Sequence, residues 1–303
     1  MGCSFCSIPL FRGRQVSRTI TSIVQEAVGY EAVGARELNL VAQEMLTYGI
    51  DQRPRTSLLE LLQELLRATA IPWIRLNYCH PRFIDNKLLD LIAEEERILP
   101  YFDMPLQHVN DRLLRAMNRP YDRKRVEKVI HSIQETLPSA QIITAFIVGF
   151  PGETKSEFRE LQDFVEGGYF RYVNVFEYSP EIGTPAAALP MQIAPTIKSL
   201  RSEELRSSQR RAFSAWAVTQ VGRRIDVLVE SRNYDLATAH THPWRGRSMW
   251  DGTEDSWVAV GGGGTLRAGD LITCEIRGSR DFVFLSEQPD LCDEPGERLR
   301  RAR

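Results

Sequence analysis

The chain has 303 residues, 43% of them hydrophobic, and a formal net charge of −2. This length suits two domains and the apolar fraction can fill a sizeable core, while the near-zero charge argues against an extended nucleic-acid-binding surface. No apolar run approaches the ~20 residues of a membrane span, and no signal peptide precedes the first cysteine. We therefore expect a cytoplasmic protein with no membrane partner.

The chain opens with a close pair of thiols, Cys3 and Cys6, with Phe5 between them. This spacing places both sulfurs on one tight loop, and thiolates are soft ligands that suit zinc or iron–sulfur clusters. By itself the pair also fits half of a zinc knuckle, a redox pair, or two thiols without a role. The remaining cysteines are too scattered for a disulfide framework, and we expect them to be structural: Cys79, Cys274 and Cys292.

Helical periodicity then alternates with short apolar runs. The predicted helices are 19–33, 55–69, 85–95, 110–117, 122–136, 154–168 and 196–221. The predicted strands are 37–42, 71–78, 100–105, 141–150 and 172–178. This alternation is typical of a parallel sheet with helices outside it, in which ligands bind at the carboxyl ends of the strands.

Polar residues and glycines gather at the ends of these strands. They are Gln43, Glu44, His80, Gln107, His108, Gly149, Gly152, Glu153, Tyr178 and Ser179. Any one of them fits a loop residue without a role, but five strand ends in succession predict a ligand site. Gly149 and Gly152 permit close approach of the backbone to a ligand. Glu153 either accepts a hydrogen bond from an amine or only favours the start of the following helix.

The C-terminal third changes character. Helix 196–221 carries many charges and reads more readily as a solvated helix that braces two domains than as a nucleic-acid-binding helix. After it, short strands are predicted between Gly-rich turns, at 224–230, 256–260, 270–276 and 281–285. This pattern predicts a small antiparallel barrel. The expected domains are 1–221 and 222–287, followed by a charged tail, 288–303, that we expect to be disordered.

Taken together, the motifs resemble the radical S-adenosylmethionine (SAM) methylthiotransferases over nearly the whole chain. Members of that family bind a [4Fe-4S] cluster through Cys-x3-Cys-x2-Cys, directly after the first barrel strand. Cys3 and Cys6 are similar to the second and third of these ligands, with Phe5 as the aromatic before the last. Residues 246–248, Gly-Arg-Ser, resemble the core of the family's TRAM domain. The resemblance implies an α/β fold, an incomplete (β/α)6 radical-SAM partial barrel without the first strand and first cluster cysteine, followed by an OB-like TRAM barrel.

The resemblance also implies the cofactors, a [4Fe-4S] cluster and SAM. It matches Gln43 and Glu44 to the contact with the methionine moiety. It matches a second group to the stretches beside the adenosine: Ile147, Gly149, Glu153, Tyr178 and Ser179. No catalytic side chain is expected, because the cofactors break the bonds. A second [4Fe-4S] cluster is expected only in an N-terminal domain that this sequence lacks, and with two of three thiolates the chain is expected to be inactive as it stands.

Two segments indicate the branch of the family. Residues 100–108 and 48–51 resemble the RimO-type branch, which methylthiolates the β-carbon of an aspartate in a small-subunit ribosomal protein. His80 and Pro81 instead resemble the branch that modifies adenosine in tRNA. A third interpretation is a non-catalytic remnant that binds a ribosomal protein or RNA through the TRAM barrel. We expect a monomer whose partner is a small-subunit ribosomal protein or the assembled subunit, with possible RNA contact through the TRAM domain.

Overall fold

The computed structural model describes residues 2–252, 256–262 and 265–288, and the chain divides into two compact units, Met1–Phe213 and Ser214–Arg303. The division falls inside the long helix α8 (Pro195–Val218), whereas the predicted boundary at residue 221 lies just after that helix. The predicted disordered tail, apart from residue 288, and Cys292 lie outside the described residues. None of the described helices is both long and apolar enough to cross a membrane.

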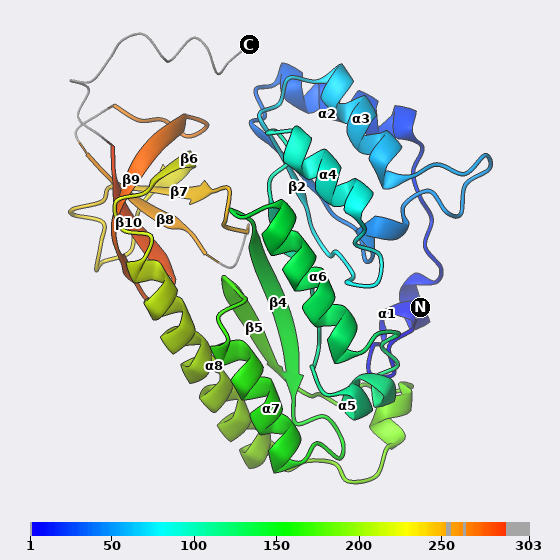
Figure 1. The fold of residues 1–303 in the computed structure, drawn as a ribbon. Helices are drawn as coiled ribbons and strands as arrows, with labels where there is room; N and C mark the ends of the chain where they lie inside the picture. The colour runs from blue at the N-terminus through cyan, green and yellow to red at the C-terminus, as the bar shows by residue number, and fades with distance from the viewer. Residues whose placement is uncertain (1, 253–255, 263–264, 289–303) are drawn as a thin grey trace. The chain divides into compact units, whose positions relative to one another are not determined.

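The first unit alternates helices and strands as predicted (Figure 1). Its helices are α1 (Ile8–Arg12), α2 (Ile20–Ala32), α3 (Leu58–Ala68), α4 (Asn86–Glu94), α5 (Asp111–Ala116), α6 (Arg123–Thr136), α7 (Lys155–Glu166) and the start of α8, with short 3₁₀ turns η1 (Met45–Thr47) and η2 (Pro185–Ala188). Its strands are β1 (Glu37–Leu40), β2 (Trp73–Leu76), β3 (Tyr101–Asp103), β4 (Gln141–Val148) and β5 (Tyr172–Glu177). The predicted helices and strands are confirmed, whereas α1, η1 and η2 were not predicted.

Local signals explain where the helices begin and which face they bury. At the start of α3, Ser57 and Glu60 form a capping box, in which each side chain accepts from the other residue's backbone amide. Thr154 and Glu157 form a second capping box at the start of α7. Helix α6 buries an apolar stripe at helical spacing, made of Val126, Val129, Ile130 and Ile133.

All strand pairs of the first unit are parallel, β1 with β2 and β3 with β4 and β5. Backbone bonds join the two groups: Cys79 N donates to Asp103 O over 2.7 Å, and Ile74 N donates to Arg97 O over 2.7 Å. The described strands therefore follow one another in chain order, β1 to β5, and their carboxyl ends share one edge. This confirms the predicted partial barrel of parallel strands with helices between them.

The second unit contains a closed barrel of the order β10-β8-β7-β6-β9. Its strands are β6 (Arg224–Arg232), β7 (Trp244–Ser248), β8 (Val258–Gly261), β9 (Leu271–Arg280) and β10 (Val283–Glu287). Four neighbouring pairs are antiparallel, but β8 and β10 pair in parallel. The barrel was predicted to be antiparallel throughout, and it differs from that prediction at this one pair.

Strand β7 was not predicted, because its charged sequence hides the strand signal. Its Gly246 lies so close to β6 that an added Cβ would be 2.5 Å from Val227 Cγ1. At one end of the barrel Trp216 packs against Trp250 and Phe284, with ring centroids 5.8 and 5.7 Å apart. The second unit therefore has an aromatic core of its own, which includes the last turns of α8.

Candidate cofactor site at the carboxyl ends of the strands

The cysteine pair lies on a tight turn, closed by a bond from Cys6 N to Cys3 O of 3.3 Å. Both side chains are half-buried. Between them, Ser4 is tied to the end of α5, because its backbone amide donates to Met117 O over 3.0 Å and its hydroxyl donates to Ala116 O over 2.7 Å. The two thiols are therefore presented by an ordered loop.

The same loop lies against the carboxyl ends of β4 and β5. Phe5 packs on a buried cluster that contains Ile147 of β4 and Tyr178, directly after β5. Tyr178 N donates to Val148 O over 2.9 Å, which keeps the two strand ends together. The family resemblance places Phe5 beside the iron–sulfur ligands, and Ile147 and Tyr178 beside the adenosine. The three side chains thus meet in a single group of apolar residues.

A guanidinium also approaches the cysteine loop. Arg119 donates from Nη1 to Cys3 Sγ over 3.4 Å, from Nε to Tyr121 Oη over 2.8 Å and from Nη2 to Pro105 O over 2.7 Å. The side chain is therefore fixed at all three nitrogens, and its positive charge lies beside the Cys3 sulfur. Sequence reasoning missed Arg119, because one more arginine after a short helix carries no distinguishing pattern.

Gln43 and Glu44, which begin three residues beyond the end of β1, differ in exposure. Gln43 is exposed, while Glu44 is half-buried and its Oε1 accepts a hydrogen bond from Leu46 N over 3.0 Å. Burial raises the pKa of Glu44 to about 7. A half-buried carboxyl with a raised pKa can bind a cationic group, since a nearby positive charge would favour its ionised form.

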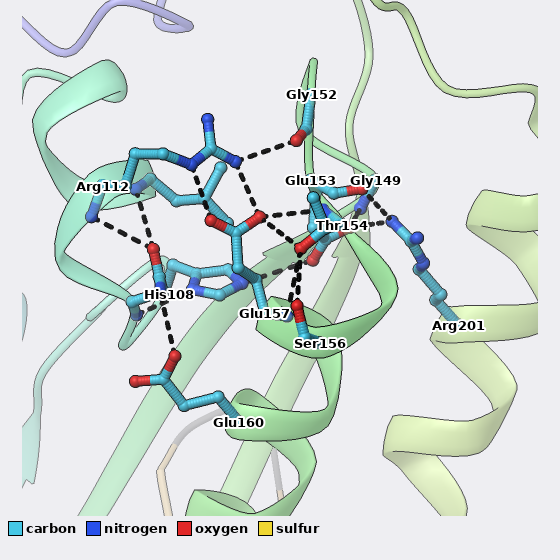
Figure 2. Close-up of polar contacts among 12 residues, drawn as sticks. His108, Arg112, Gly149, Gly152, Glu153, Thr154, Ser156, Glu157, Glu160 and Arg201 are labelled. Atoms are coloured by element: carbon cyan, nitrogen blue, oxygen red, sulfur yellow. Dashed lines mark hydrogen bonds and ion pairs between the residues drawn. The ribbon is translucent and has the colours of Figure 1, made fainter.

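The turn after β4 is held by a buried carboxylate (Figure 2). Glu153 Oε2 accepts from Gly149 N and from Arg201 Nη1 of α8, and Glu153 Oε1 lies 3.2 Å from His108 Nε2. His108 Nδ1 accepts from Asn110 N over 3.0 Å, so in the neutral ring Nε2 carries the proton and donates to Glu153. Figure 2 shows His108 and Arg201 reaching this carboxylate from opposite sides.

Both oxygens of Glu153 therefore already have partners within the protein. This favours a role in holding the Gly149 turn over direct contact with an amine, and its assignment to the cofactor site stays a prediction. A second clamp holds the same turn, because Arg112 donates to Gly152 O over 2.8 Å and pairs with Glu157 over 2.6 Å. The Arg112 guanidinium lowers the pKa of Glu157 to about 2.

The glycines of this turn need their positive φ angles, 72° at Gly149 and 78° at Gly152. The close approach at Gly149 is made from within the protein: an added Cβ would lie 2.4 Å from Lys198 Cγ. Ser179, the other residue predicted at the end of β5, is exposed.

The remaining candidates have structural surroundings. His80 is buried, its ring lies edge-on against Tyr121, and burial lowers its pKa to about 3. Cys79 is fully buried and burial raises the pKa of its thiol. Cys274 is buried in the second unit, where burial raises its pKa to about 11. These surroundings agree with the structural role expected for both cysteines.

Cys3 and Cys6 fit an iron–sulfur cluster in kind, since they are soft donors on one ordered loop. They are, however, only two of the three cysteines that bind the cluster in the family's motif. Across residues 2–252, 256–262 and 265–288, no three His, Cys, Asp or Glu side chains gather where they could hold a metal ion. The assignment of Cys3 and Cys6 as ligands of such a cluster therefore stays a prediction.

Comparison with known proteins agrees with this geometry. The profile of the Radical SAM superfamily matches residues 1–165. The ribosomal protein uS12 methylthiotransferase RimO of Syntrophotalea carbinolica is 38% identical over 292 residues, which cover 96% of this chain and 63% of the relative. RimO of Aquifex aeolicus is also 38% identical, over 96% of this chain and 67% of the relative. RimO of a Synechococcus strain is 41% identical over 94% and 59%.

The chain therefore belongs to the radical SAM superfamily and, within it, to the RimO-type methylthiotransferases. It spans about three fifths to two thirds of the length of these relatives. The predicted family is confirmed, and with it the family's cofactors, a [4Fe-4S] cluster and SAM. Among solved structures, coproporphyrinogen III oxidase HemN from Escherichia coli is 18% identical over 70% of this chain and 50% of its own, with a TM-score of 0.48, too low to support an argument.

Proposed function

We propose that this chain carries the radical SAM unit of an enzyme that methylthiolates the β-carbon of an aspartate in ribosomal protein uS12. The observation that carries the proposal is the apolar cluster of Phe5, Ile147 and Tyr178. These side chains join the cysteine loop to the ends of β4 and β5. A site for SAM requires this, because its iron–sulfur cluster and its adenosine pocket must lie next to each other. The names of the relatives supply the substrate.

In this proposal Cys3 and Cys6 would be two of the ligands of the iron–sulfur cluster, which would supply the electron for cleavage of SAM. The protein's own part is to bind and orient. Glu44 receives the positively charged amine of the methionine moiety, and Gln43 lies beside it. Ile147, Gly149, Tyr178 and Ser179 line the adenosine side, where the apolar cluster excludes water. Glu153 fixes the turn that begins at Gly149.

The second unit would recognise the substrate. We propose that the barrel, residues 222–287, is a TRAM domain that binds the ribosomal protein or the assembled small subunit and contacts RNA there. Its Ser248 and Ser256 hydroxyls donate to the fully buried Asp251, over 2.6 and 2.5 Å, so Asp251 joins the end of β7 to the residues just before β8. We infer a monomer that acts in the cytoplasm, where ribosomes are.

The test uses ribosomes from a strain that lacks its own uS12 methylthiotransferase. The chain, expressed together with any upstream coding sequence in its reading frame, should add the mass of one methylthio group to uS12, as measured by intact-protein mass spectrometry. If uS12 keeps its mass and methylthio-adenosine appears in tRNA instead, the branch assignment is wrong. If neither product forms while the cluster is loaded, the chain is a non-catalytic binder.

A further inference from the structure

A buried lysine of helix α8 lies at the edge of the sheet where β4 and β5 end. Lys198 is only 8% exposed, and its Nζ donates to Tyr178 O over 2.7 Å. The ammonium also lies 4.9 Å from the centre of the Tyr178 ring. Its aliphatic stem rests on Gly149, the position where any Cβ would collide with it. One side chain thus touches the ends of both β4 and β5.

One turn further along α8, Arg201 reaches the same edge. It donates to Glu153 Oε2 and, over 3.2 Å, to Glu153 O, while Glu153 Oε2 accepts from Gly149 N. Lys198 and Arg201 are three residues apart, so they lie on one face of the helix. This face therefore grips the end of β4 through Glu153 and Gly149, and the end of β5 through Tyr178.

The burial of Lys198 indicates that this side chain has a role beyond packing. Removing an ammonium group from water is costly unless it is well hydrogen-bonded, and an apolar side chain of similar length would cover Gly149 without that cost. What the lysine adds is a donor for Tyr178 O, at the point where β5 has ended. The side chain therefore fixes the position of a carbonyl, and with it the ring of Tyr178.

We propose that Lys198 and Arg201 are positioning residues, which hold the ends of β4 and β5 at the spacing that receives the adenosine part of SAM. The inference rests on the proposed SAM site. Neither residue needs to touch the ligand. Lys198 acts through Tyr178 and Gly149, and Arg201 acts through Glu153.

The test compares Lys198→Met, which keeps the length and removes the donor, with Lys198→Arg, which keeps a donor. The matched control is Arg210→Gln on the same helix, where an exposed arginine pairs with Glu203. The probe is S-adenosylhomocysteine, which carries the adenosine without requiring a loaded cluster, and its Kd is measured by calorimetry on the full chain. Amide hydrogen exchange of peptides that contain Gly149 and Tyr178 is measured in parallel.

We expect Lys198→Met to weaken binding of the probe about tenfold or more, because without this charge-assisted hydrogen bond only a minor fraction of molecules keeps the strand ends at the spacing that binds the probe. Lys198→Arg should recover most of the affinity, and Arg210→Gln should bind as the wild type does. Exchange should accelerate in Lys198→Met at the two strand ends and remain unchanged in α6. A merely stabilising lysine would instead raise exchange throughout the unit.

Two results separate the possible failures. If the wild type binds the probe and Lys198→Met binds it equally well, the positioning role is wrong while the SAM site stands. If the wild type does not bind the probe, the nucleoside site itself is refuted, and the positioning role falls with it.

Discussion

The buried carboxylate of Glu153 offers a sharp test of how the turn after β4 is held. Its side chain is fully buried, and it joins Gly149 N, His108 and Arg201, whose own side chain is only 11% exposed. Removing one partner from a buried ion pair costs about 3–5 kcal/mol, and a glutamine would keep one acceptor worth about 1 kcal/mol. We therefore expect Glu153→Gln to lower the free energy of unfolding by about 2–4 kcal/mol.

The assay is urea unfolding followed by far-UV circular dichroism, which reports on helices, and every described helix begins in the first unit. The control is Glu203→Gln, which removes an exposed partner of Arg210 and should cost no more than about 1 kcal/mol. A loss below about 1 kcal/mol in Glu153→Gln, or an equal loss in the control, would show that this network does not hold the turn.

Three further predictions concern the cysteine loop, the buried glutamate and the barrel. Anaerobic reconstitution of the 303-residue chain should give little stable four-iron cluster and no 5′-deoxyadenosine from SAM, whereas a chain extended upstream through a cysteine four residues before Cys3 should give both. Glu44→Gln should unfold at higher urea than the wild type above pH about 7, and the difference should vanish below about 4.5, because burial penalises only the ionised carboxyl. A fragment of residues 214–288 should fold alone and be about 3 kcal/mol more stable than 222–287, which lacks Trp216.

Each of these predictions has an outcome that contradicts it. Cleavage of SAM by the short chain at a rate comparable to the extended one would mean that another residue serves as the third ligand. A wild type and a Glu44→Gln variant that differ equally at all pH values would mean that the Glu44 carboxyl is solvated. A collapsed proton–nitrogen spectrum for residues 214–288 would mean that the barrel depends on the first unit.

The order of the strands could be predicted because the first unit is built from local signals. Apolar runs of strand length alternate with helical stripes such as that of α6, and parallel strands joined by helices follow one another in space. The predicted location of the site rests on the same rule, since residues after successive strands share an edge. The seam between β8 and β10 could not be predicted, because closure of a small barrel depends on contacts between segments distant in sequence. The same holds for β7, whose Gly246 and Arg247 take their strand conformation from β6 and not from their own propensity.

The residues that hold the strand ends in place could not be predicted from sequence patterns, for a different reason. On a helix such as α8 a lysine or arginine is usually solvated, and a charged sequence gives no signal that Lys198 is buried on Gly149 while Arg210 is exposed. The signal that was available lay in the partners, a glycine directly after β4 and a glutamate in the turn that follows it. Glu153 was identified as a candidate ligand because it lies at the edge of the sheet, yet the structure uses both its oxygens internally. Residues at the edge of a parallel sheet therefore divide into those that face the ligand and those that fix the edge, and that division depends on which helices pack behind them.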